Sequence, residues 1–288
     1  MKKNPGMIYA LPALFWLSFF FVIPLCIIIC YSFLTKGLYG GVVGKFTVAA
    51  YQSLANPLLL SISGMTLFIA AASTIIMVLL ALPAAYYIAR SRHRTILLIL
   101  VIIPFWTNFL IRVYAWIAIL GNNGFVNNVL LDLHMSTAPL QFLYNRNAVI
   151  LVTVYTYLPF AILPLYAAIE KFDFSLLEAA RDLGATKWQS IRTVLLPNIR
   201  AGITMAALFT FIPSFGSYAI PQIIGGRDSM MLGTVIAREL TVTRNWPLSS
   251  SISVALTLLT AIGILIFVRA NRGTADRGRK IREEEAAA

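Results

Sequence analysis

The sequence predicts an all-α protein that crosses a membrane six times, and three observations support this fold class. Of the 288 residues, 59% are hydrophobic and only 12% are charged, about half the charged share of a soluble domain. The mean hydropathy is +0.81. Long uncharged runs alternate with short basic links, and several runs reach the length of about 20 apolar residues that crosses a bilayer. This composition excludes a soluble enzyme, a disulfide scaffold and a disordered regulator.

The basic residues indicate how the chain is oriented. The predicted spans lie near residues 8–33, 61–89, 95–120, 148–169, 201–224 and 249–268. An even number of spans places both termini on one side, and that side, with the links 90–94 and 170–200, carries most of the 23 Lys and Arg residues. The positive-inside rule therefore predicts cytoplasmic termini. Topology and anionic membrane lipids then explain the net charge of +12 without nucleic acid.

We expect three parts along the chain. Residues 1–60 form the first transmembrane helix and an external loop, and residues 61–268 form a membrane core that contains a cytoplasmic loop, 170–200. Residues 269–288 form a basic cytoplasmic tail. Cys26 and Cys30 lie in the first span without other metal ligands nearby, so we expect small packing groups there and no metal site.

The segment 170–200 differs from the other links because it is long, amphipathic and charged with both signs. Ser175 with Glu178 three residues later fits a capping box and predicts the start of a helix. Gly184 permits a turn, and a second helix is expected to run until Pro197. The pattern predicts a helix-turn-helix, which is either a solvated hairpin or a docking element.

The same segment resembles the EAA loop of bacterial ABC importer permeases. The likeness rests on Glu178-Ala179-Ala180, on Gly184 after three further residues, and on Val194-Leu195-Leu196-Pro197 after nine more. Valine in place of isoleucine is the one departure from the family pattern. The resemblance implies that this loop carries the coupling helix, which sits in a groove of an ATPase subunit. The implied coupling residues are Glu178, Ala179, Ala180, Gly184, Leu196 and Pro197.

Residues 104–116, 225–233 and 244–247 are similar to spermidine/putrescine permeases of the PotB and PotH type. This resemblance covers essentially the whole chain. It implies the MetI-like type I ABC importer permease fold in a bacterial inner membrane, and transport of a polyamine. It also implies a second permease subunit in a heterodimer, two ABC ATPase subunits and an external solute-binding protein. ATP and magnesium would be bound by the ATPase, so this chain is expected to need no cofactor and to be no enzyme.

Aromatic and polar side chains of the third and fourth spans are candidates for lining a transport path. They are Trp106, Asn108, Arg112, Tyr114, Trp116 and Tyr155. Aromatic faces attract organic cations by about 0.5–2 kcal/mol. An interfacial aromatic belt predicts the same residue types, and Arg112 alternatively extends to the external interface.

The fifth span is expected to break within 211–222, because this stretch contains two prolines, a glycine and four polar side chains. Non-helical backbone at membrane depth requires protein or a wet cavity around it, so we expect a gate here, with a simple kink as the alternative. The gate residues are Ser214, Ser217, Tyr218 and Gln222. Many polyamine-type relatives have an acidic residue near this stretch, whereas Ser217 and Gln222 are neutral. The transported solute is therefore alternatively another organic cation, or an opine-like or amino-acid-like compound.

The acidic residues bear on the energy source. All eleven lie in predicted links, span margins or the tail. Ion-coupled carriers commonly place a carboxylate near the membrane midplane, so its absence favours an outside energy source. The alternative is an ion-coupled carrier or channel that is complete in one chain. His93 and His134 lie outside the spans and no hydrolase motif accompanies them, so we expect no catalytic residues.

Overall fold

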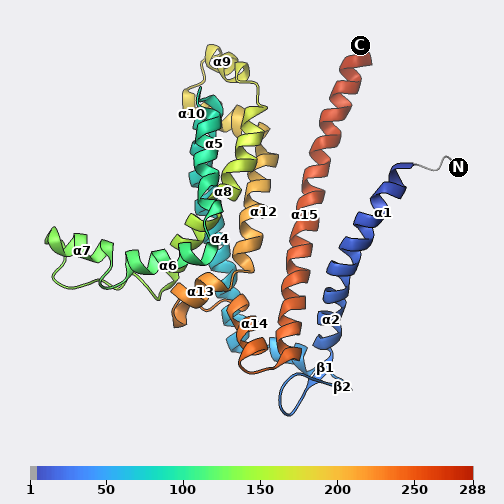
Figure 1. Cartoon of the computed structure of the whole chain (residues 1–288). Coiled ribbons are helices and arrows are strands. Elements are labelled where there is room, and N and C mark those ends of the chain that lie inside the picture. The colour runs from blue at the N-terminus through green and yellow to red at the C-terminus, as the bar shows by residue number, and fades with distance from the viewer. Residues whose placement is uncertain (1–4, 288) are drawn as a thin grey trace. The chain divides into compact units, whose positions relative to one another are not determined.

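A computed structural model describes the backbone of residues 5–287, and most of it is helical (Figure 1). The chain forms two compact units. The first unit combines residues up to Ile62 with Leu232–Leu259, and the second combines Ser63–Met231 with residues from Thr260 onward. This helical content confirms the all-α prediction.

Within the part of the chain that the structure describes, five helical stretches are long and apolar enough to cross a membrane. They are Leu11–Ser32, Pro57–Arg90, Phe109–Asp132, Arg146–Glu170 and Trp246–Leu265. A sixth span is present if the bent pair Lys187–Asn198 and Arg200–Phe215, which meet at 71°, is counted as one. The structure therefore supports a multi-pass membrane protein with five or six crossings.

The first unit contains a long N-terminal helix, a small β-hairpin and helical segments from both ends of the chain. α1 (Pro5–Leu17) continues through a π-helical turn, η1 (Ser18–Val22), into α2 (Ile23–Ser32). Between Leu11 and Tyr31 the apolar side chains of this helix are exposed or half-exposed, which is typical of a helix that faces lipid. The antiparallel strands β1 (Leu34–Lys36) and β2 (Val42–Phe46) follow, and then α3 (Ala49–Leu54). α14 (Leu232–Thr241) and the first part of α15 (Trp246–Ala287) complete the unit.

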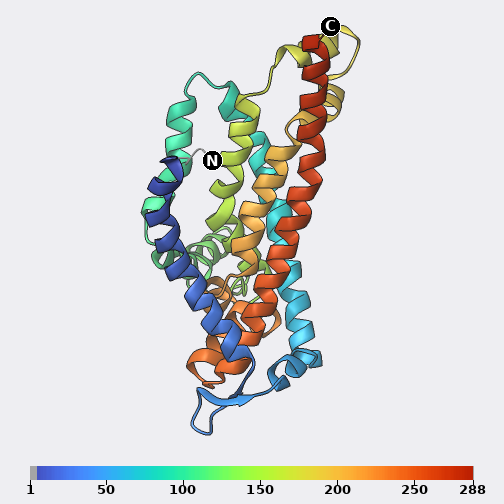
Figure 2. The same ribbon diagram turned by 90° about the vertical axis from the view of Figure 1, so that its right-hand side faces the viewer.

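Three long helices run side by side in the second unit: α4 (Pro57–Arg90), α8 (Arg146–Glu170) and α12 (Arg200–Phe215) (Figures 1 and 2). α8 and α12 pack directly on each other. The close approach depends on Gly202, where an added Cβ would overlap the Cβ of Ala168 and lie 3.3 Å from the Pro164 carbonyl oxygen. Glycine therefore sets the distance between these two helices.

The prediction that residues 95–120 form the third span as one continuous helix is wrong. The structure divides this stretch into α5 (Arg94–Ile102), the 3₁₀ turn η2 (Ile103–Trp106) and α6 (Phe109–Leu120), and α5 and α6 run in different directions (Figure 1). Thr107 is extended, and the Asn108 side chain accepts hydrogen bonds from the N–H groups of Leu110 and Ile111. Asn108 therefore caps a new helix, because its side chain satisfies donors that a helix start leaves unpaired. α7 (Phe125–Asp132) follows α6.

Short elements join the long helices. α9 (Ser175–Asp182), α10 (Lys187–Ser190), a π-helical turn η3 (Ile191–Leu195) and α11 (Leu196–Asn198) connect α8 to α12. α13 (Ala219–Ile224) and the 3₁₀ turn η4 (Arg227–Ser229) follow α12.

Two hydrophobic clusters fill the second unit. Prominent members of the first cluster are Met77, Ala81, Leu165, Ile169, Leu177, Leu195 and Ile199. Prominent members of the second are Ile69, Val113, Val149, Val152, Ile220 and Ile224. The first cluster thus reaches the loop between α8 and α12, and the second reaches α6 and α13.

Candidate coupling loop and transport path

The loop between α8 and α12 is a helix-turn-helix, as the sequence predicts, but its caps differ from the prediction. Ser175 and Glu178 form no capping box. Instead the Ser175 N–H donates a 3.0 Å hydrogen bond to Asp173 Oδ1. Hydrogen bonds from the Ser175 side chain and backbone lower the pKa of the exposed Asp173 carboxyl. The capping box forms one helix later, between Thr186 and Gln189.

Gly184 makes the turn between the two short helices. Its φ of +90° is a left-handed conformation, and its N–H donates a 2.8 Å hydrogen bond to the Arg181 carbonyl. A Cβ built on Gly184 would meet nothing within 4 Å. Glycine is therefore required here by the backbone conformation and not by crowding inside this chain.

The loop has one anchored face and one exposed face. Leu177 and Leu195 are 2% and 1% exposed and belong to the first hydrophobic cluster, together with Ile199 at the start of α12. By contrast, Leu183 and Trp188 are 90% and 68% exposed. We call the exposed face, which comprises Leu176, Glu178, Ala179, Leu183 and Trp188, the loop surface.

The end of the loop leads into a sharp bend. Leu196 and Pro197 belong to α11, and the helices on either side of Ile199 meet at 71°. Proline has no backbone N–H, so it cannot continue a regular helix from the preceding turn. Because Leu195 and Ile199 are buried in the same cluster as α8 side chains, the bend is fixed by packing on both sides.

An ion pair relates the loop to another link. Arg94 Nη1 and Glu170 Oε1 are 3.0 Å apart, although the two residues are 76 positions apart in the sequence. Both side chains are substantially exposed, so the pair adds little stability, about 0–1 kcal/mol. It does place the 90–94 link beside the start of the loop, as the predicted topology requires.

Around Arg112 on α6, aromatic side chains from two other elements, η2 and α8, meet. The guanidinium carbon lies 5.5 Å from the centre of the Phe105 ring, and that ring contacts Phe160 edge-on at 5.0 Å. Arg112 Nε is buried and has no hydrogen-bond partner among the described residues. The Arg112 guanidinium therefore lies over an aromatic group of the second unit, and its extension to the external interface stays a prediction.

The structure brings together some of the other candidate path residues and separates others. Trp116 and Tyr155 are in edge-to-face contact, with ring centres 5.3 Å apart. Trp106 and Tyr114 are exposed, at 87% and 57%. Asn108 serves as the cap of α6.

The fifth span breaks where the sequence predicts. α12 ends at Phe215, and α13 begins only at Ala219. Ser217, in the break, is 7% exposed. The remaining gate candidates differ in exposure: Ser214 is buried and donates to the Thr210 carbonyl, whereas Tyr218 and Gln222 are exposed.

Each of the three long helices buries a pair of hydroxyl side chains near the hydrophobic clusters, and sequence reasoning missed this layer. We call it the hydroxyl layer; its members are Ser73 and Thr74 on α4, Thr153 and Thr156 on α8, and Thr210 and Ser214 on α12. Among the described residues, the hydroxyls of Ser73, Thr74 and Thr156 have no hydrogen-bond partner. Buried hydroxyls without partners are rare, because each costs about 1–3 kcal/mol.

Known proteins resemble the chain over almost its full length. It is 40% identical over 259 residues to the spermidine/putrescine transport system permease protein PotB of Haemophilus influenzae. This alignment covers 89% of this chain and 91% of that protein. PotB of Escherichia coli is 36% identical over 89% of this chain and 94% of its own length. The inner membrane ABC transporter permease protein YdcU of Escherichia coli is 30% identical, and the alignment covers 92% of this chain and 90% of that protein.

Solved structures share the fold. A chain of a bacterial ABC transporter involved in the import of the acidic polysaccharide alginate superposes with a TM-score of 0.75 at 17% identity, covering 94% of this chain and 96% of that one. A chain of the MetNI methionine ABC transporter gives a TM-score of 0.56 at 21% identity, and the match covers 76% of this chain and 98% of that one. These matches confirm the predicted importer permease fold.

A family model agrees with these relatives. The model of the binding-protein-dependent transport system inner membrane component matches residues 77–277, which include the loop and the break in the fifth span. The chain belongs to this family of membrane permease subunits, as the sequence resemblance indicated.

Proposed function

We propose that this chain is the permease subunit of an ABC importer that moves a polyamine such as spermidine or putrescine into the cytoplasm. The observation that carries the proposal is 40% identity over nearly the whole chain to a spermidine/putrescine permease protein. The second candidate solute class, another organic cation or an opine-like or amino-acid-like compound, is favoured by the neutral Ser217 and Gln222 in the gate stretch.

The proposed assembly contains two ABC ATPase subunits, a second permease subunit in a heterodimer and an external solute-binding protein. Solved transporters of the same fold support these partner types, including one in complex with a ligand-bound periplasmic protein. ATP and magnesium would be held by the ATPase subunits, so this chain would do mechanical work and no chemistry. Its termini would lie in the cytoplasm of a bacterial cell, at the inner membrane.

In the proposed mechanism the loop transmits ATPase movement to α12. The loop surface, together with Ala180, Gly184, Leu196 and Pro197, would sit against the ATPase. Leu177, Leu195 and Ile199 anchor the loop in the first cluster, so displacement of the loop displaces the packed ends of α8 and α12. A packed core transmits strain because it deforms little.

The proposed path runs past the break in the fifth span and the aromatic group around Arg112. The path residues are Trp106, Asn108, Arg112, Tyr114, Trp116, Tyr155, Ser214, Ser217, Tyr218 and Gln222. A path without carboxylates would bind a cation weakly, through aromatic faces and hydroxyl oxygens. Weak binding suits a path, because the solute must also leave it.

The test is reconstitution of the chain in liposomes, alone and with its ATPase, second permease and binding protein. We expect uptake of labelled spermidine by the full assembly only, and only with ATP inside the vesicles at the ATPase side. Uptake by the lone chain under an ion gradient would instead establish the alternative, an ion-coupled carrier. Competition by unlabelled polyamines, other organic cations and opines would identify the solute class.

The hydroxyl layer yields a prediction about the path. Thr156→Val keeps the side-chain shape and removes a hydroxyl that has no partner, so the melting temperature should stay equal or rise. If the hydroxyl is wetted or bonded to solute when the path opens, its loss should slow uptake about fivefold, equivalent to about 1 kcal/mol. The matched control is Thr210→Val, which removes a hydroxyl bonded to the Ala206 carbonyl at 2.9 Å and should lower the melting temperature. Unchanged uptake in Thr156→Val would exclude the hydroxyl from the path.

A further inference from the structure

The hairpin that follows the first span presents two large side chains at its tip. Leu38 and Tyr39, between β1 and β2, are 92% and 90% exposed. Large apolar or aromatic side chains on a short rigid turn are typical anchors of protein–protein interfaces. α4 separates this hairpin from the 90–94 link, which Arg94 and Glu170 place beside the coupling loop. In the topology predicted from the sequence, the segment 34–60 that contains the hairpin lies on the external side of the membrane.

The tip is held in place by its neighbours. The Gly41 N–H donates a 2.9 Å hydrogen bond to the Arg244 carbonyl, and a Cβ on Gly40 would overlap the Cβ of Arg244. At the base, the rings of Phe33 and Phe46 stack with centres 5.6 Å apart. Because the turn is already ordered, little conformational entropy is lost when a partner binds it.

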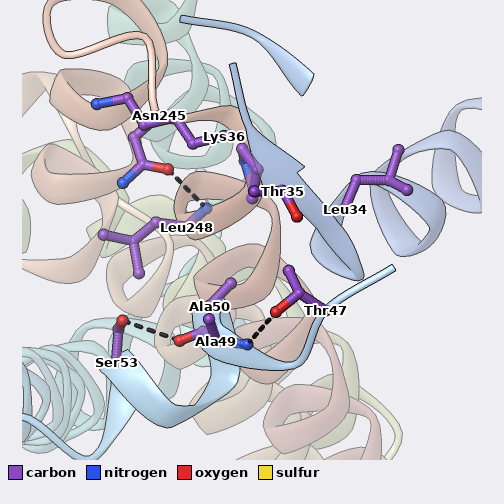
Figure 3. A pocket seen from close by; sticks show the side chains of 10 residues that line it. Leu34, Thr35, Lys36, Thr47, Ala49, Ala50, Ser53, Asn245 and Leu248 are labelled. Carbon is purple, nitrogen blue, oxygen red and sulfur yellow. Dashed lines mark hydrogen bonds between the residues drawn. The ribbon is translucent and has the colours of Figure 1, made fainter. Parts of the chain in front are cut away.

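A small pocket opens beside the base of the hairpin, between β1, α3 and the start of α15 (Figure 3). Its volume of about 220 Å³ is below the roughly 300–1,000 Å³ of small-molecule sites, so it fits one inserted side chain better than a free solute. Several of its polar groups are already bonded within the pocket wall: Thr47 Oγ1 accepts from the Ala49 N–H, and Asn245 Oδ1 accepts from the Leu248 N–H. Lys36 is the charged residue of the lining.

The exposed charged side chains of the hairpin are basic, and the nearby carboxylate of Glu239 on α14 accepts a 2.6 Å hydrogen bond from Oγ1 of Thr243, the residue before Arg244. Lys36, Lys45 and Arg244 are exposed, and the segment 34–60 contains no Asp or Glu. A basic surface with an apolar tip complements a partner that presents carboxylates around a hydrophobic depression.

We propose that the hairpin tip and the adjacent pocket dock an acidic surface of the external solute-binding protein. Leu38 and Tyr39 would enter a depression of that protein, and one of its carboxylate side chains would enter the pocket beside Lys36. This inference rests on the proposed function, because it takes the partner from the proposed assembly. Lipid phosphates have the same charge, and the experiment distinguishes them from the protein.

The experiment measures ATPase activity of the full assembly in nanodiscs while the concentration of solute-loaded binding protein is varied. We expect the double variant Leu38→Ser/Tyr39→Ser and the single variant Lys36→Glu each to raise the half-saturating concentration about tenfold or more, with the maximal rate unchanged. The charge control is Arg92→Glu, an equal reversal at an exposed position in the 90–94 link, which should leave the half-saturating concentration unchanged.

Two outcomes would overturn the docking proposal. One is a wild-type half-saturating concentration in both hairpin variants. The other is an ATPase rate that is lowered in the hairpin variants at every concentration of binding protein, by an amount that depends on the anionic lipid content of the nanodisc. That result would show that the hairpin binds lipid. In either case wild-type stimulation by the binding protein would still support the proposed function; its absence in the wild type would overturn both.

Discussion

Replacing Leu183 with aspartate is expected to reduce ATP-driven uptake about tenfold or more while the chain still folds and inserts. The side chain is 90% exposed, so it supports almost no contact within the chain. Burying a leucine against a partner is worth about 1.5–3 kcal/mol, or about 10–100-fold in affinity, and a carboxylate would reverse that gain. The measurement is uptake in proteoliposomes, together with co-purification of the ATPase and the melting temperature of the isolated permease.

Leu177→Ala and a pair of substitutions at Gly184 separate docking from folding. Leu177→Ala lies six residues earlier on the anchored face, is 2% exposed, and should lower the melting temperature before it affects docking. Gly184→Asn should preserve uptake better than Gly184→Val, because asparagine tolerates the left-handed conformation and valine does not. Normal uptake and ATPase binding in Leu183→Asp would show that the loop surface is not the docking surface.

Replacing Gly202 with valine is expected to prevent stable packing of α8 against α12. The added Cβ would overlap Ala168, and overpacking of a dense core costs about 1–3 kcal/mol for each misfit, with more where backbone must move. The folded yield and the melting temperature should both fall sharply in fluorescence-detected size exclusion and thermal unfolding.

The matched control for this change is Gly64→Val in α4. A Cβ at Gly64 would meet nothing within 4 Å, so the same substitution in another long helix adds no overlap. This variant should retain its folded yield. Equal losses in the two variants would mean that valine disfavours these helices generally, and that Gly202 sets no helix distance.

The features that the sequence predicted correctly are local. The turn at Gly184 and the break after Phe215 both follow from residues within a few positions, namely a glycine between amphipathic stretches and a cluster of proline, glycine and serine. The coupling residues follow from spacing along one segment, and their role remains a prediction. Local patterns of this kind specify backbone conformation because glycine and proline restrict it directly.

The features that the sequence missed depend on competition or on packing. Because hydropathy is averaged over a window, it predicted one continuous span across Thr107 and Asn108. In the structure these two side chains compete for backbone hydrogen bonds, and a new helix starts there. Asp173 displaced the predicted capping box because its carboxylate reaches the Ser175 N–H. The hydroxyl layer depends on how α4, α8 and α12 align with one another, and no single segment encodes that alignment.

Cysteine labelling tests most directly whether the coupling loop faces the ATPase side. The labelling variants would be made in a cysteine-free protein in which alanine replaces the exposed Cys26 and Cys30. In intact spheroplasts a membrane-impermeant maleimide should label a Tyr39→Cys variant and should label a Leu183→Cys variant only after permeabilisation. Labelling of Leu183→Cys from outside would place the loop on the external face and would contradict transmission of ATPase movement through it.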